Sequence, residues 1–215
     1  MTTDFEKYVA ATKAFKTKYE SLPGDMPYAI DVWGEAHATP ATCVTTASTG
    51  TETCNGNGDG IVWLSTGSNE SFRYWQQLAN AGLIEGRFNG IACPSVYYCT
   101  DAANSPSSKI SNSLWLMFSW GQLMGDPSVF DGNYNNFYMF GRQTTGAAPE
   151  TNNLKPEELW NIDTKMDDGK PATGKLVPRS WTGDCTNATS GGDTSATYEL
   201  SNSAIVCRSV FRGMF

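Results

Sequence analysis

The sequence has little histidine, few charged residues and no long apolar run. His37 is the only histidine among 215 residues, and 17% of the chain is charged. No stretch of about 18 apolar residues is present, so no segment of this chain is predicted to span a bilayer. The first residues also lack the apolar region of a secretory signal peptide. Heptads and internal repeats are absent, which excludes coiled coils and solenoids.

The charge that is present is mostly negative. Twenty-two acidic residues face 15 basic ones, giving a net charge of −7. A groove for nucleic acid is therefore not expected to be the main site, because phosphate binding needs a basic surface. Abundant glycine, serine, threonine, asparagine and aromatic residues are typical of an extracellular, loop-rich protein that contains β-structure. The length suits a single globular domain over residues 1–215.

The N-terminal stretch reads as one amphipathic helix, followed by a loop-rich α/β head. We expect the helix over residues 3–21 and the head over 22–215. Spacing of about three or four residues places one apolar stripe on the helix; its members are Phe5, Tyr8, Val9, Thr12, Phe15 and Tyr19. Thr12 can bury its methyl group while its hydroxyl bonds back to a carbonyl. The residues from Thr3 to Glu6 predict a capping box, and Leu22-Pro23-Gly24 ends the helix.

The remaining patterns predict an α+β fold. A second helix is expected over residues 70–81, with Asn69 as its N-cap, and a third begins at Pro156. A short helical turn is expected from Ala29 to Trp33. Aromatic and β-branched runs predict strands over 113–120, 136–141 and 203–210. We expect these strands to form an antiparallel sheet against which the N-terminal helix packs.

Six cysteines fall into three pairs that are close in sequence: Cys43 with Cys54, Cys93 with Cys99, and Cys185 with Cys207. Metal binding is the alternative, but no CxxC spacing exists and histidine is scarce. Disulfides in an oxidising compartment are favoured. Of the 15 pairings that six cysteines allow, we expect the sequential one, because it ties each loop at its base. Since no export signal precedes this disulfide framework, we expect that a native N-terminal segment before Met1 has been removed.

A glycine-rich motif from Cys54 to Gly60 matches the first half of a Ca²⁺ loop. Asn55, Asn57 and Asp59 place oxygen-bearing side chains at alternate positions, and Gly60 turns the backbone. The twelfth position is Thr66 rather than glutamate, so Glu70 is the nearest candidate for the missing ligand. Further carboxylates would come from a second set, Asp163, Asp167 and Asp168, if the fold brings it close. The alternative is an ordinary glycine-rich turn without a metal.

The sequence contains no strong pattern of residues that would indicate a catalytic site. A Ser-His-Asp set would have to use His37, which lies in a threonine- and alanine-rich loop without a nucleophile elbow. The acids at 163, 167 and 168 sit in a turn, where solvated turn formers or cation ligands are favoured over a glycosidase pair. We therefore expect a protein that is not an enzyme.

Four blocks of sequence resemble the bacterial type IV pilin-like and pseudopilin family. They are Phe15 to Ala29 with its Leu-Pro-Gly-Asp run, Asn55 to Gly60, Trp75 to Gly86, and Ile162 to Pro171. The resemblance implies a long N-terminal helix, half embedded in the membrane and half packed on an antiparallel sheet in a pilin-like roll. It implies other pilin subunits as partners, an inner-membrane anchor before assembly, and a place on the cell surface or in a periplasmic pseudopilus. The apolar half of that helix, with its cleavage and methylation site, is absent from this chain.

Two functions follow as hypotheses. The first is a structural subunit, major or minor, of a type IV pilus-like or type II secretion-like filament. The second is a tip or adhesin module that binds a glycan, a surface or DNA. Four tryptophans are candidate platforms for such binding, with burial as the alternative: Trp63, Trp115, Trp120 and Trp181. An exposed aromatic patch remote from the first helix would favour recognition.

Overall fold

The N-terminal helix α1 comprises Thr2–Tyr19 in the computed structural model, which describes residues 1–37, 39, 42–110, 112–213 and 215. The helix ends at Glu20, whose left-handed backbone (φ 51°) lets its N–H donate to the carbonyl of Lys16. The predicted capping box is wrong. The helix begins one residue earlier, at Thr2, and its N-cap is Met1, which has no side chain that can cap.

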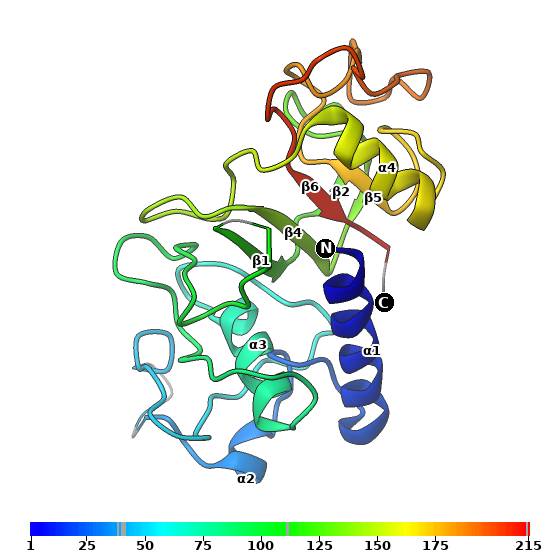
Figure 1. Cartoon of the computed structure of the whole chain (residues 1–215). Helices are drawn as coiled ribbons and strands as arrows, with labels where there is room; N and C mark the ends of the chain where they lie inside the picture. The colour runs from blue at the N-terminus through cyan, green and yellow to red at the C-terminus, as the bar shows by residue number, and fades with distance from the viewer. Residues whose placement is uncertain (38, 40–41, 111, 214) are drawn as a thin grey trace.

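The part of the chain that the structure describes adds three further helices and six strands (Figure 1). The helices are α2 (Ala29–Trp33), α3 (Glu70–Asn80) and α4 (Pro156–Met166). The strands are β1 (Ser113–Phe118), β2 (Gly121–Leu123), β3 (Gly132–Tyr134), β4 (Phe137–Arg142), β5 (Leu176–Pro178) and β6 (Ser209–Phe211). The α+β class is thereby confirmed.

Four strands form one antiparallel sheet in the order β1-β4-β6-β5. The register pairs Trp115 with Phe140 across β1 and β4, and Val177 with Val210 across β5 and β6. Strands β2 and β3 form a separate antiparallel ribbon. Helix α3 contacts β1 and helix α4 contacts β5, so the two helices lie toward opposite edges of the sheet (Figure 1).

Both faces of this sheet are covered, because successive side chains of a strand point to opposite sides. Trp115, Met117 and Tyr138 belong to one apolar cluster together with residues of α1 and α3. The neighbouring residues Leu116 and Phe118 belong to the other cluster, which α1 does not join. The sheet therefore separates a face that α1 reaches from one that it does not.

The first turns of α1 reach the sheet through aromatic rings. The ring of Phe5 stacks on that of Phe211 with centroids 4.4 Å apart, and Tyr8 meets Trp115 edge-on at 5.6 Å. The hydroxyl of Thr12 donates to the carbonyl of Tyr8 at 2.8 Å, as predicted, and contacts the hydroxyl of Tyr138 at 3.2 Å. This end of the helix therefore makes specific contacts with β1, β4 and β6.

The second half of α1 has different neighbours. The ring of Phe15, which is fully buried, contacts the rings of Tyr19 at 4.5 Å and of Trp33 in α2 at 6.1 Å. Val9 and Tyr19 are only partly buried, while Ala11 is buried although the predicted stripe did not include it. The stripe is therefore shared between the sheet and the loops around α2.

All three sequential disulfides are present, and the described chain has no free cysteine. The bond between Cys43 and Cys54 joins Cα atoms 6.0 Å apart, that between Cys93 and Cys99 joins atoms 5.1 Å apart, and that between Cys185 and Cys207 joins atoms 5.2 Å apart. The predicted pairing is confirmed.

The strand prediction for 203–210 is only partly correct. β6 begins at Ser209, and upstream of it Cys207 forms a lone bridge with Leu154 instead of extending the ladder. β1 ends at Phe118 rather than at Trp120, because the chain turns through Gly121, whose φ of 78° few other residues adopt.

Candidate functional site

The glycine-rich motif encloses the carboxylate of Asp25, which lies in the turn that follows α1. Asp25, 2% exposed, accepts the N–H groups of Gly58 at 2.7 Å, Asp59 at 3.2 Å and Gly60 at 2.9 Å. Gly58 and Gly60 have φ angles of 74° and 83°, which aim successive N–H groups inward. Such a concave row of N–H groups binds anions. We call this arrangement, Asp25 with residues 58–60, the loop clamp.

Glu70 holds the same loop from its other side. Its carboxylate accepts the N–H groups of Asn57 at 3.2 Å and Trp63 at 2.8 Å. Burial raises the pKa of Glu70 to about 7, opposed by these two N–H groups and reinforced by the charges of Asp25 and Asp59. The carboxylates of Asp25, Asp59 and Glu70 thus lie close together, and the backbone of the loop donates N–H groups to them.

The predicted Ca²⁺ ligands of this loop already accept hydrogen bonds within the protein. The side-chain oxygen of Asn55 accepts the N–H of Ile30 at 3.0 Å, and that of Asn57 accepts the N–H of Asp59 at 2.9 Å. Asp59 accepts the N–H of Ile61 at 2.8 Å and the indole N–H of Trp63 at 2.9 Å. These contacts satisfy the oxygens of the loop without a cation, so the geometry favours the alternative interpretation of a glycine-rich turn.

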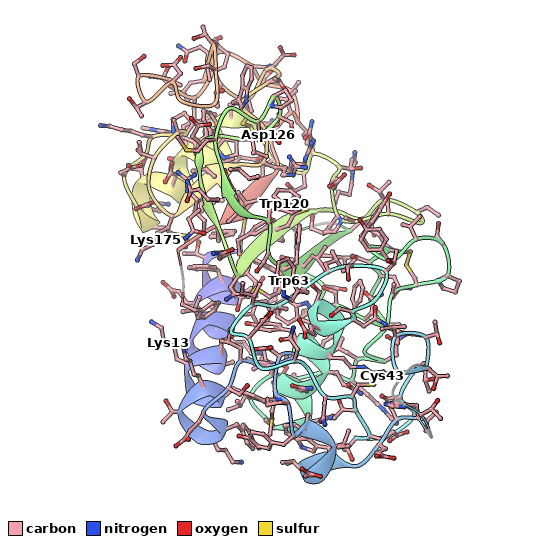
Figure 2. All side chains as sticks on the ribbon, turned by 180° about the vertical axis from the view of Figure 1, so that it is seen from behind. Lys13, Cys43, Trp63, Trp120, Asp126 and Lys175 are labelled. Carbon is pink, nitrogen blue, oxygen red and sulfur yellow. A yellow bond between two sulfur atoms is a disulfide. The ribbon has the colours of Figure 1, made fainter. Side chains whose placement is uncertain are left out.

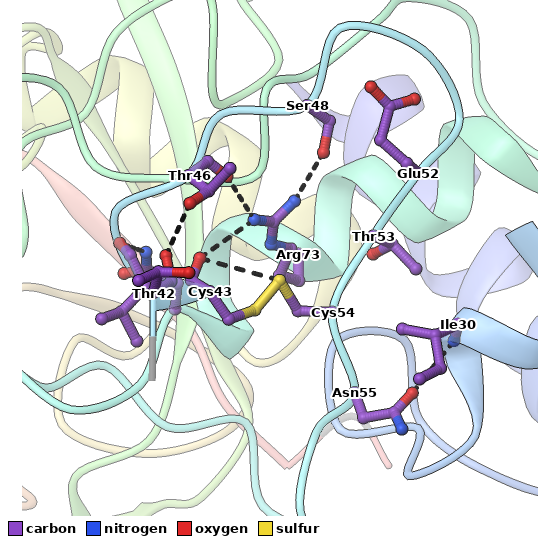
Figure 3. Close-up of a disulfide and its surroundings, with 12 residues drawn as sticks. Ile30, Thr42, Cys43, Thr46, Ser48, Glu52, Thr53, Cys54, Asn55 and Arg73 are labelled. Carbon is purple, nitrogen blue, oxygen red and sulfur yellow. Dashed lines mark hydrogen bonds between the residues drawn. A yellow bond between two sulfur atoms is a disulfide. The ribbon is translucent and has the colours of Figure 1, made fainter. Parts of the chain in front are cut away.

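A buried arginine organises the neighbouring disulfide loop (Figure 3). Arg73 of α3 is 2% exposed and donates to the carbonyls of Cys43 at 3.1 Å and Thr46 at 2.7 Å, and to the hydroxyl of Ser48 at 2.7 Å. Burial lowers the pKa of Arg73 to about 10, and the charge of Glu52 opposes this shift. The Arg73 guanidinium therefore holds the loop around residues 43–48, which forms no strand and no α-helix, through hydrogen bonds to three of its residues.

This arrangement buries α3 on every side. Gln76 accepts the hydroxyl of Thr53 at 2.8 Å, and Gln77 accepts the N–H of Gly24 at 2.7 Å. The sequence predicted the helix but not the burial of its polar side, because nothing in its periodicity shows that a loop will cover that side. A cavity of about 370 Å³ is lined by Arg73, Glu70 and Trp63, among others.

The second predicted metal set is gathered at the end of α4. One carboxylate oxygen from each of Asp163, Asp167 and Asp168 lies within 4.8 Å of the others. Asp163 is fully buried, and its Oδ2 accepts the hydroxyl of Tyr198 at 2.8 Å. Burial raises the pKa of Asp163 to about 7, opposed by the Tyr198 hydroxyl and reinforced by the two neighbouring carboxylates. We call these residues the acidic cluster.

The two metal sets do not combine among the residues that the structure describes. The carboxylates grouped at the end of α4 include none from the 55–70 loop, and Asp59 makes its contacts with Asn57, Ile61 and Trp63 instead. The other group with metal-ligand spacing in the described residues is His37 with Cys43 and Cys54. The sulfur atoms of that group form a disulfide, so no thiolate is left to bind a metal.

His37 gives no support to a catalytic triad. Its Nδ1 is buried and makes no hydrogen bond with any residue in the described ranges. A general base in a triad needs an oriented partner on each ring nitrogen.

An aromatic groove lies on the sheet face that α1 does not reach. Its volume is about 290 Å³, and it is lined by Leu64, Tyr97, Tyr98, Leu116, Phe118, Trp120, Ala148 and Glu150. Tyr97 is 42% exposed, and the guanidinium of Arg179 lies 4.5 Å from the centre of the Trp120 ring. Arg179 also approaches Glu150 at 3.7 Å. The groove thus combines aromatic surfaces with a charged pair.

The candidate tryptophans have different environments. Trp115 is fully buried in the sheet and Trp63 is 40% exposed, while Trp120 and Trp181 are partly buried. The views in Figures 1 and 2 place Trp63 and Trp120 on the face of the molecule that is turned away in Figure 1. Only Trp120 lines the aromatic groove.

No protein-family model matches this chain, no curated protein matches it, and no solved structure matches it. The fold and the three disulfides define an α+β protein of an oxidising, non-cytoplasmic compartment. Among the described helices, none is both long and apolar enough to cross a bilayer.

Proposed function

We propose that this chain is the globular part of a type IV pilin-like or pseudopilin subunit that builds an extracellular filament and catalyses no reaction. The observation that carries the proposal is the asymmetry of α1. One side of the helix is buried through Phe5, Tyr8 and Phe15, while Lys7 and Lys13 on the other side are exposed. Helix α1 lies along the edge of the molecule (Figure 1), and Lys13 is labelled there in Figure 2. A helix displayed in this way offers an uncovered surface to a neighbouring copy.

The arrangement of the resembling blocks supports the same proposal. Asp25, from the first block, is held by the second block through the loop clamp. Gly24, also from the first block, donates its N–H to Gln77 in the third. Segments that are far apart in sequence thus form one framework around the end of α1, as expected if their residues serve a shared structural purpose. In this proposal the fold is a pilin-like roll.

The partners in this proposal are other pilin subunits, in a filament of one or several kinds of chain. An apolar helical segment preceding Met1 would anchor the complete protein in the inner membrane before assembly and pack in the filament core afterwards. The exposed side of α1 would then face the neighbouring head. Nucleic acid remains disfavoured as the main partner, because the net charge is −7.

Charge reversal on the exposed side of α1 tests assembly. In cells that make the complete protein, Lys7→Glu should lower the amount of this chain recovered in filaments sheared from the surface. Arg87→Glu is the matched control, since Arg87 is exposed and carries the same charge but is not part of α1. Both variants should melt like the parent. The proposal fails if the parent chain is missing from the sheared fraction, or if both reversals leave its recovery unchanged.

The aromatic groove favours a second function, recognition of a glycan at a filament tip. Aromatic rings offer flat apolar surfaces to a sugar, and the Glu150–Arg179 pair offers hydrogen-bond partners to its hydroxyls. Tyr97→Ala should weaken binding to an oligosaccharide array at least tenfold, while Tyr28→Ala, exposed beside α1, should not change it. A parent protein that binds no oligosaccharide on the array would remove this second function and leave the first in place.

A further inference from the structure

The acidic cluster lies where α4 ends and the chain turns toward β5. Asp163 is on the last turn of the helix, Asp167 is its C-cap, and Asp168 follows. One oxygen from each lies within 4.8 Å of the others. Oxygen ligands of Ca²⁺ stand about 2.4 Å from the ion, so ligands on opposite sides of it are about 4.8 Å apart. The three carboxylates are therefore close enough together to contact one ion.

No cationic side chain in the described part of the chain forms a salt bridge with these carboxylates. Its salt bridges join Met1 to Asp4 and Arg179 to Glu150, and neither involves the acidic cluster. Asp163 is 0% exposed, and its Oδ1 has no hydrogen-bond partner among the described residues. A buried anionic oxygen without a donor or a cation is costly. We propose that Asp163, Asp167 and Asp168 bind one Ca²⁺ ion.

The surrounding turn holds two of the ligands in place. Asp167 accepts the N–H groups of Lys175 and Leu176, the second at 3.2 Å, and Asp168 accepts the N–H of Lys170 at 2.9 Å. Gly174 has a φ of 72°, and a side chain at this position would collide with the Asp167 carboxylate. The C-terminal end of α4 also carries partial negative charge, which favours a cation. These contacts orient the ligands before any ion arrives.

The chemistry of the ligands selects a hard cation. All three ligands are carboxylates, whereas Zn²⁺ prefers nitrogen and sulfur. Mg²⁺ demands near-ideal octahedral geometry, while Ca²⁺ accepts irregular sets of six to eight oxygens and can complete its shell with water or backbone carbonyls. Asp168 is exposed, so water can reach the ion. Ca²⁺ should therefore bind more tightly than Mg²⁺.

Ion binding would connect α4 to the C-terminal disulfide loop. The hydroxyl of Tyr198 donates to Asp163 Oδ2, and Tyr198 lies between Cys185 and Cys207. An ion on Oδ1 of the same carboxylate would hold it ionised and in place. Ca²⁺ should therefore make the 185–207 loop more resistant to protease as well as raise the melting temperature.

The test is a Ca²⁺ titration of the purified chain after treatment with a chelator. Calorimetry should show one site, and Tb³⁺ should give tryptophan-sensitised luminescence that excess Ca²⁺ removes, because the Trp160 indole lies beside Gly169 of this turn. Asp168→Asn, which changes an exposed carboxylate, should weaken Ca²⁺ binding at least tenfold. Asp163→Asn should do the same, and the melting temperature of each variant shows whether it is folded.

Asp59→Asn is the matched control, because Asp59 belongs to the glycine-rich loop that resembles half a Ca²⁺ site. It should bind Ca²⁺ like the parent. The proposal is overturned if the parent shows no Ca²⁺ binding at millimolar concentration, if Asp59→Asn abolishes binding, or if folded Asp168→Asn binds as tightly as the parent. The measurement uses the isolated chain, so its outcome is independent of filament assembly.

Discussion

Replacing Asp25 by asparagine should open the loop clamp and destabilise the whole protein. Asp25 is 2% exposed and receives three backbone N–H groups, at 2.7, 2.9 and 3.2 Å. An asparagine keeps one oxygen acceptor and turns an NH₂ group toward the remaining donors. Each buried donor left unpaired costs about 1–3 kcal/mol. Because the loop itself is exposed and water can reach part of it, we expect a loss of about 2–4 kcal/mol.

For a chain of this size about 1 kcal/mol corresponds to about 2–4 °C in melting temperature. The expected fall is therefore about 5–15 °C, measured by circular dichroism and checked by guanidinium unfolding. Asp193→Asn is the control: its carboxylate also accepts backbone N–H groups, from Thr189 and Ser195, but it lies in an exposed turn. A melting temperature for Asp25→Asn that matches this control would refute the view that the clamp ties the loop to α1.

Three further outcomes are expected. Phe15→Ala should cost about 3–5 kcal/mol because it empties a fully buried site, and an unchanged thermal melt would show that this half of α1 is dispensable. Replacing both Cys185 and Cys207 by serine should cost about 3 kcal/mol by removing the crosslink, and peptide mapping of the parent without reductant should yield this pair linked. The pKa of Glu70 is raised in the fold to about 7, so its stabilising contribution is complete below pH 4 and is lost as the pH rises through 7. Stability curves in chelator should therefore slope downward over this range, and Glu70→Gln should make that slope shallower, the remainder coming from Asp163, whose pKa is also raised to about 7.

The sequence predicted those elements whose signal is local. Helices α1, α3 and α4 follow from periodicity, a stop signal or an N1 proline, and β1 and β4 follow from aromatic runs. Asn69 is the N-cap of α3 as expected, yet its side chain donates to the carbonyl of Val44 rather than capping the helix. The sequence predicted that Asn69 precedes the helix, but it could not predict that its side chain bonds to Val44.

Elements defined by distant partners could not be predicted. β5 is three residues long, ends in Pro178, and exists only because β6 pairs with it at the sheet edge, where proline is tolerated. The predicted Ca²⁺ loop shows the same limit. The spacing of residues 55–60 allows a loop whose side-chain oxygens point inward and bind a cation. It equally allows a loop whose backbone N–H groups point inward and bind an anion. The second arrangement forms because of Asp25, a carboxylate that lies about 30 residues earlier in the chain. The acidic cluster was visible as a set, but the burial of Asp163 beside Tyr198 was not.

The closeness in sequence of the three disulfide partners has a consequence for how the chain matures. The paired cysteines are 11, 6 and 22 residues apart. Closing such short loops costs little chain entropy, so each partner is at high local concentration as soon as its own segment has been exported. The bonds can form in order during translocation, without waiting for the C-terminus and with no need for an isomerase to undo long-range mispairing. Oxidation of this protein should therefore be complete soon after the last cysteine emerges.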